Sequence, residues 1–128
     1  MRTAAAAILG CFLLAAPAAA APRELSGTWR GTWTNAAVGT HGAVRLVGGS
    51  APALRLAGPA LGCAQPTRLP LHYRRGVLTG NGRDVPCNEG LRWSLRGRLA
   101  HGRIAGTLTL RLADGSRATV ALELRRAR

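Results

Sequence analysis

Two tryptophans, four residues apart, lie in the segment Gly27 to Asn35, which reads GTWRGTWTN. Alternate side chains of an extended chain point to the same side, so Trp29, Gly31, Trp33 and Asn35 share one face. Large aromatic side chains beside a glycine could line a pocket for a small ligand. The same side chains also suit a packed core, because each buries a large apolar area.

Two more aromatic residues extend this candidate ligand-binding set. Tyr73 and Trp93 both fall on the predicted inner face of later strands. The other inner positions are almost all Leu, Val or Ala, so few polar groups could orient a polar ligand. We therefore expect any interior ligand to be small and apolar.

Arginine supplies a second kind of binding chemistry. All 18 basic residues are arginines, and the chain carries a net charge of +13. Such a charge attracts anions, and guanidinium groups bind phosphate or sulfate bidentately. The candidate anion-binding residues, all on predicted outer faces, are Arg30, Arg45, Arg55, Arg92, Arg96, Arg98, Arg103 and Arg111. Arg117 and Arg125 share that outer face. The alternative is that the arginines reflect codon usage and only keep the protein soluble.

Catalysis is not expected from this sequence. His41, His72 and His101 lie in or beside different strands and turns, and the five carboxylates are scattered. No nucleophile, phosphate-binding or zinc-binding motif is found. We expect no catalytic residues, no metal site and no cofactor, and we consider nucleic acid an unsuitable partner because the aromatics are predicted to face inward.

The first twenty residues are typical of a secretory signal peptide. Arg2 precedes an apolar run, and Ala18 to Ala20 provide small residues for cleavage after Ala20. An alternative is lipidation at Cys11, which follows Ile8-Leu9-Gly10 in a loosely lipobox-like order. We expect an exported protein, periplasmic or extracellular, with one domain over residues 21–128 and no transmembrane segment in it.

Two cysteines remain after the predicted signal peptide, Cys63 and Cys87. An even number of cysteines in an exported chain favours a disulfide. Their spacing lacks the CxxC form, and no histidine completes a metal-ligand pattern. We predict a structural disulfide between them.

Period-two alternation dominates after residue 22, interrupted by Gly, Pro, Asn and Asp. Residues 81–90 are expected to form a loop. The predicted strands are 28–35, 43–47, 53–57, 68–73, 77–80, 91–99, 103–112 and 117–125. Eight short strands with one apolar face predict an all-β, eight-stranded antiparallel up-and-down β-barrel, because closure removes exposed edges. A β-sandwich is the alternative. Glycines on the inner face either let strands coil tightly or leave room for a ligand.

The segment LSGTWRGTW resembles the first strand of calycin-type barrels, the lipocalins, avidins and small bacterial relatives. The resemblance implies a barrel in which the tryptophan of Gly-x-Trp closes one end. Gly31-Thr32-Trp33-Thr34-Asn35 is also similar to the avidin pattern, which implies a ligand contact for Asn35, although the later aromatic lining of avidins is missing.

Glu24-Leu25-Ser26-Gly27-Thr28-Trp29 is similar to the opening of periplasmic inhibitors of bacterial metalloproteases. This second resemblance implies a protein partner. The sequence therefore predicts a non-catalytic binding protein, for an apolar ligand inside or an anionic envelope component outside, with a protease-inhibitor-like interaction protein as the alternative.

Overall fold

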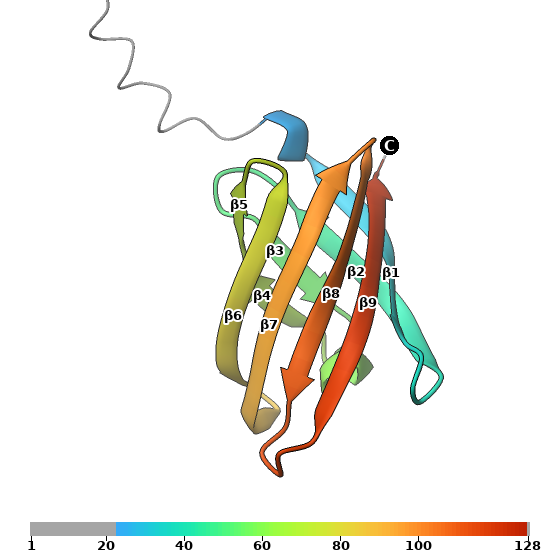
Figure 1. Cartoon of the computed structure of the whole chain (residues 1–128), viewed down its shortest axis with the longest axis vertical. Coiled ribbons are helices and arrows are strands. Elements are labelled where there is room, and N and C mark those ends of the chain that lie inside the picture. Colours follow the sequence, from blue (N-terminus) through green and yellow to red (C-terminus); the bar gives the residue numbers. More distant parts are fainter. Residues whose placement is uncertain (1–22, 128) are drawn as a thin grey trace, which may run out of the picture.

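The structure is a computed structural model that describes residues 23–127. The predicted signal peptide, residues 1–20, and Cys11 lie outside the described residues. Nine strands form one antiparallel sheet (Figure 1). The strands are β1 (Thr28–Asn35), β2 (Thr40–Val47), β3 (Ala53–Leu56), β4 (Thr67–Pro70), β5 (His72–Arg74), β6 (Val77–Val85), β7 (Asn88–Ala100), β8 (Arg103–Arg111) and β9 (Arg117–Arg126).

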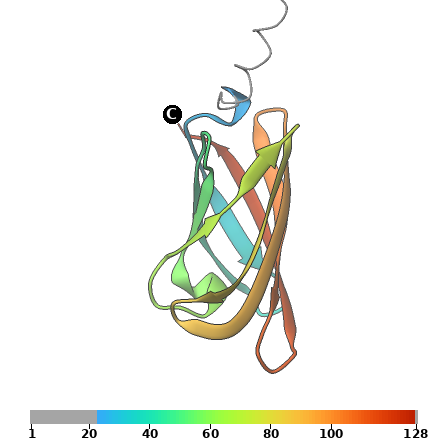
Figure 2. The ribbon, with the colours of Figure 1, turned by 90° about the vertical axis from the view of Figure 1, so that its left-hand side faces the viewer.

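The sheet curls into a nearly closed barrel. Its strand order is β4-β3-β2-β1-β9-β8-β7-β6-β5, so the two edge strands are consecutive in the chain. Figure 2 shows β4 and then β5 crossing from the neighbourhood of β3 to that of β6. Only Leu71 separates the two strands, and its N–H donates to the carbonyl of Pro52 at 2.9 Å. The all-β barrel prediction is confirmed, and the architecture is compatible with a calycin-like barrel.

The predicted count of eight strands is wrong by one. The segment 68–73, expected as a single strand, is divided into β4 and β5. Proline has no N–H to donate to a neighbouring strand, and Pro70 is the last residue of β4. The chain therefore changes partner at this point, from β3 to β6.

The expected loop over residues 81–90 is also wrong for most of its length. β6 continues to Val85 and β7 begins at Asn88, so the two strands form a long hairpin. Asn81 and Gly82 are common in turns, but both fit this strand. Asn81 faces solvent, as does Arg83, and Gly82 lies beneath the indole of Trp93.

Alternation along the strands separates an apolar interior from a polar exterior. The tryptophans and most inward leucines are buried, while the intervening residues are exposed. At Gly31, a Cβ atom would collide with the carbonyl of Glu123 in β9, and at Gly106 it would lie 2.8 Å from the carbonyl oxygen of Arg96. These two inward glycines therefore serve close strand approach, which is the first of the two roles considered for them.

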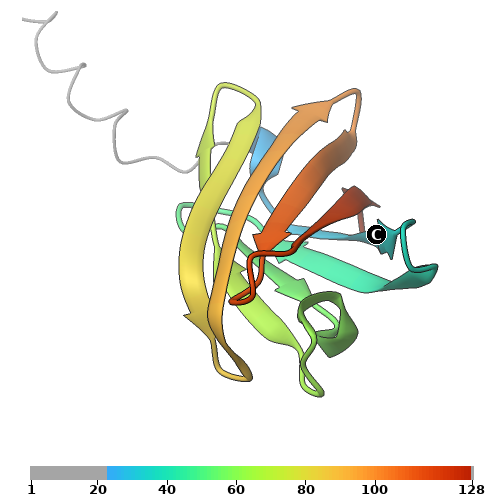
Figure 3. The same ribbon diagram turned by 60° about the horizontal axis from the view of Figure 1, so that its bottom comes forward.

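Short 3-10 helices lie at opposite ends of the barrel. Helix η2 (Arg23–Leu25) precedes β1, at the top of Figure 1, and we call this the Trp29 end. Helix η3 (Gly58–Leu61) lies at the other end, which comes forward in Figure 3. Cys63, just after η3, is bonded to Cys87 between β6 and β7, with a Cα–Cα distance of 5.5 Å, which confirms the predicted disulfide. We call this the disulfide end.

Across residues 23–127, the structure contains no helix with the length and apolar character needed to cross a membrane.

Candidate functional site

Trp29 closes one end of the barrel. Its side chain is buried, and its indole N–H donates to the carbonyl of Leu25 in η2 at 3.2 Å. The guanidinium of Arg126 lies over the ring, 4.5 Å from its centroid. Arg126 also donates to the carbonyls of Ser26 and Glu24. Trp29 is thus held by a cation–π contact and a hydrogen bond, in a structural position at the barrel's end.

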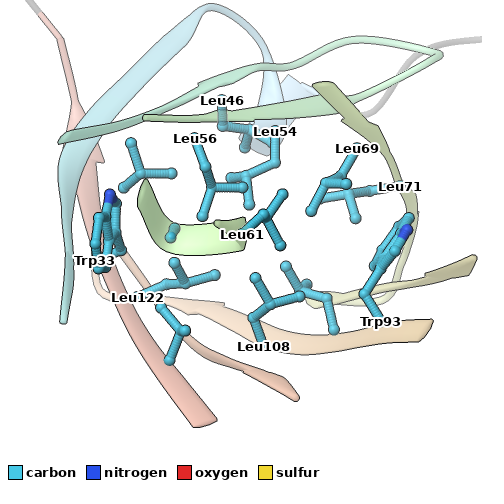
Figure 4. Packing of buried hydrophobic residues seen from close by; sticks show 14 of the residues in the cluster. Trp33, Leu46, Leu54, Leu56, Leu61, Leu69, Leu71, Trp93, Leu108 and Leu122 are labelled. Carbon is cyan, nitrogen blue, oxygen red and sulfur yellow. The ribbon is translucent and has the colours of Figure 1, made fainter. Parts of the chain in front are cut away.

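Trp33 and Trp93 line opposite sides of the interior (Figure 4). Each ring packs over a glycine directly across from it on the neighbouring strand, Gly42 for Trp33 and Gly82 for Trp93. A Cβ atom at either glycine would clash with the indole of the facing tryptophan. The three predicted pocket tryptophans therefore do not line a common cavity, because Trp29 closes one end and the leucine core lies between Trp33 and Trp93.

The interior contains very little empty space among the described residues. A void of about 10 Å³ lies among inward-facing side chains that include Leu46, Leu95 and Leu122. This volume is near the minimum for one water molecule, and its lining is apolar. Leu61 of η3 also projects into the ring of core side chains (Figure 4). The void is too small for an apolar ligand in the packing seen here.

The other two predicted pocket residues lie apart from each other. Tyr73, in β5, is half-buried at the Trp29 end, and its hydroxyl donates to a carboxylate oxygen of Glu24 at 3.1 Å. Burial, and then this hydrogen bond, raise the pKa of Tyr73. Asn35 ends β1 at the far end of that strand. Asn35 Oδ1 and Trp33 Nε1 are the buried side-chain polar atoms without a hydrogen-bond partner within residues 23–127.

The outer face carries a more coherent arrangement. All eight predicted anion-binding arginines are exposed. Strand pairing places arginines directly beside one another across six consecutive strands. This long arginine row consists, in order across the sheet, of Arg68, Arg55, Arg45, Arg30, Arg125 and Arg103. Neighbouring strands lie about 4.8 Å apart, so the row extends about 24 Å around the barrel.

A second set of arginines is aligned in the same way. This short arginine row consists of Arg83, Arg92, Arg111 and Arg117, on β6, β7, β8 and β9. The remaining two candidates, Arg96 and Arg98, lie on β7 between the levels of the two rows.

Both rows include residues that the sequence prediction did not select. Arg68 and Arg83 were missed as binding candidates, the first two residues before Pro70 and the second in an expected loop. Arg117 and Arg125 were placed on the outer face but not chosen. Alternation marks Arg68, next to the inward Leu69, as an outward residue; nothing local marks its alignment with Arg55.

Few negative charges oppose the long row. Within the described chain, one ion pair is formed, between Arg103 and Glu123 at 4.0 Å, and both side chains are largely exposed. Like charges directly opposite on neighbouring strands destabilise a sheet. The repulsion between neighbouring arginines should therefore lower the stability of the sheet. The exposed Arg103–Glu123 ion pair is too weak to offset this loss.

A hollow of about 340 Å³ lies within the long row. Arg30, Arg45 and Arg55 line it, and Ala57 and Pro66 contribute apolar surface. Its surface is mainly apolar, so the hollow itself offers few hydrogen-bond donors to an anion. No family model and no curated protein matches this chain in the comparisons made.

Proposed function

We propose that the protein is an exported, non-catalytic binding protein whose long arginine row binds a linear polyanion of the cell envelope. The observation that supports this most strongly is the lateral alignment of six arginines on six neighbouring strands. A chain of phosphate, sulfate or carboxylate groups running across the strands could contact them in succession.

The chemistry of the row suits repeated oxyanions. Each guanidinium remains charged and offers a planar fork of donors that matches phosphate, sulfate or carboxylate. The row is exposed along its whole length. Bound anions would also relieve the repulsion between neighbouring arginines, which gives binding a favourable contribution beyond the individual contacts.

Two further observations support a ligand on the outside and an exported protein. The interior void of about 10 Å³ is small for an apolar ligand, which favours a site on the outside of the barrel. The disulfide is typical of proteins in oxidising compartments, where envelope polyanions are accessible.

Salt-dependent binding to heparin, used as a model polyanion, tests the proposal. For six contacts, affinity should fall about 10³-fold between 50 and 200 mM salt. The variant Arg30→Gln/Arg45→Gln removes two central contacts and should reduce this fall to about 10²-fold. Both side chains are exposed, so the fold should be retained.

The matched control is Arg74→Gln/Arg75→Gln, which removes the same charge from exposed positions outside both rows. This variant should keep most of the wild-type affinity and its salt dependence. An equal loss in both variants would show that net charge alone causes binding and would overturn the proposal. Failure of the wild-type protein to bind at 50 mM salt would also overturn it.

A further inference from the structure

The short arginine row has the features of a second anion-binding site. Arg92, Arg111 and Arg117 are direct neighbours on β7, β8 and β9 and border a hollow of about 270 Å³. Ser94 and Thr109, which also pair across β7 and β8, line the same hollow. Three guanidinium groups and two hydroxyl groups thus surround one concavity, a set of donors suited to phosphate or sulfate.

The two rows are well separated where they share strands. On β8 they are represented by Arg103 and Arg111, and on β9 by Arg125 and Arg117. Eight residues of extended strand correspond to about 26 Å. This separation is several times the screening length of about 8 Å at physiological salt, so the rows attract anions independently.

The surface between the rows on β8 and β9 is not basic. Its outward residues are Ala105, Thr107, Thr109, Thr119, Ala121 and Glu123. Glu123 would repel a polyanion that crossed this strip. A basic path between the rows exists on β7, through Arg96 and Arg98, but it follows the strand. A single chain occupying both rows would have to turn from across the strands to along β7 and back again.

Acidic residues lie near the short row, but their carboxylates are used locally. Asp84 accepts from the N–H of Gly90 at 2.6 Å, and Asp114 accepts from the N–H of Ser116 at 2.8 Å. Neither forms an ion pair with a described arginine. With Glu89, which is exposed in β7, they make this end less positive than the long row.

From this arrangement we infer that the protein has two separate polyanion sites, one on each row, and joins two polyanion chains. The inference rests on the proposed function, because it requires the long row to bind polyanions. The short row has two fewer arginines. It should bind roughly 30-fold more weakly at 0.15 M salt, since each contact contributes roughly 0.7 to the logarithm of the affinity.

Titration calorimetry with a short heparin oligosaccharide of defined length tests the number of sites. The wild-type protein should bind two oligosaccharides, one more tightly than the other. The variant Arg111→Gln/Arg117→Gln should bind one, with the tighter affinity retained. Arg74→Gln/Arg75→Gln is the control for net charge and should still bind two.

Light scattering with long heparin chains tests bridging directly. Wild-type protein should form large complexes with heparin. These complexes should dissolve when heparin is in excess, because few heparin chains then carry more than one protein molecule. The Arg111→Gln/Arg117→Gln variant should form only small complexes. Scattering from each protein without heparin, and its circular dichroism, control for self-association and loss of fold.

The outcomes separate the two proposals. One oligosaccharide per wild-type protein, on the long row alone or along a path from it through Arg96 and Arg98, would overturn bridging while leaving the long-row site intact. Two oligosaccharides bound by Arg111→Gln/Arg117→Gln would also overturn it. Absence of binding to every form of the protein would instead refute the proposed function itself.

Discussion

The two ends of the barrel are closed by different interactions. At the Trp29 end, a buried tryptophan, an arginine over its ring and hydrogen bonds to backbone carbonyls hold η2 against the strands. At the disulfide end, a covalent bond joins the segment after η3 to the β6–β7 turn. Asn88 adds one hydrogen bond there, donating from Nδ2 to the carbonyl of Leu61 at 3.1 Å.

This difference concerns how each end resists unfolding. The Trp29 end joins residues about 100 positions apart in sequence, because Arg126 binds carbonyls next to β1. All of its contacts are lost when the chain unfolds. The disulfide instead persists in the unfolded chain and limits the conformations available to it. The first end should therefore respond mainly to side-chain substitution, and the second to reduction of the disulfide.

The largest effect is expected from Trp29→Ala. Removal of a fully buried tryptophan leaves a cavity and should lower the free energy of unfolding by about 3–5 kcal/mol. Urea denaturation followed by circular dichroism measures this change. Val38→Ala is the control, because Val38 is 67% exposed and should change stability little. A loss below about 1 kcal/mol for Trp29→Ala would contradict the structural role of this residue.

The second effect concerns the disulfide end. Cys63→Ser/Cys87→Ser should lower the free energy of unfolding by about 3.5 kcal/mol, because the unfolded chain regains the conformations restricted by the 24-residue separation. Wild-type protein unfolded under reducing conditions should show the same loss. If reduction leaves the urea midpoint unchanged, the disulfide does not stabilise this end.

Gly48→Ala should disturb the Trp29 end from the backbone side. A Cβ at this position would collide with the carbonyl of Leu25, and the N–H of Gly48 donates to Gly27 at 2.8 Å. Overpacking of this kind lowers stability by about 1–3 kcal/mol. Thermal unfolding measures the loss, with the exposed Ser50→Ala as the nearby control. Equal melting temperatures for the two variants would argue against the close approach.

Two neighbouring arginines should behave in opposite ways. Arg126→Gln removes the cation–π contact with Trp29 and two hydrogen bonds, and should lower stability by about 1–2 kcal/mol. Arg125→Gln removes a charge from the long row and should leave stability unchanged or slightly higher, since it relieves like-charge repulsion. Heparin binding should show the reverse order, with the larger loss for Arg125→Gln. Equal changes in both measurements would refute the separation of structural and binding arginines.

The smallest effects should depend on pH, with opposite signs at the two ends. The pKa of Tyr73 is raised above 10.0, first by burial and then by Glu24. The folded state therefore disfavours the phenolate, and this contribution is present below pH 10 and lost as pH rises through the raised pKa.

At the β8–β9 turn near the disulfide end, hydrogen bonds from Ser116 lower the pKa of Asp114 below 3.8. Its contribution is present above that pH and lost as pH falls through the lowered pKa. Tyr73→Phe should therefore reduce the alkaline loss of stability, and Asp114→Asn the acid loss. Chemical denaturation across the pH range checks both. A change in the acid limb for Tyr73→Phe would be inconsistent with this assignment.

Local sequence features predicted much of the fold. β1 was predicted with its observed bounds, and Cys63 and Cys87 were correctly paired. The errors arose where tertiary contacts overrode local signals. Asn81 and Gly82 indicate a turn in isolation, but pairing with β7 and packing beneath Trp93 keep them in a strand.

The candidate sites were predicted less completely than the fold. The sequence identified Trp29, Trp33 and Trp93 as inward residues, but not that Trp33 and Trp93 lie on opposite sides of the leucine core. It also placed eight arginines outside, yet missed Arg68 and Arg83. Neither packing nor partnership between distant strands can be obtained from the spacing of residues along one strand.

The sequence alone determined which side of the barrel wall most strand residues occupy, because side chains alternate along an extended chain. It also determined the charge and the composition of both faces. Only the tertiary structure decided which outward residues became neighbours. Register between strands depends on non-local pairing, and a shift of one residue would place inward side chains opposite outward ones. That register turns scattered arginines, such as Arg30, Arg45 and Arg125, into one continuous row.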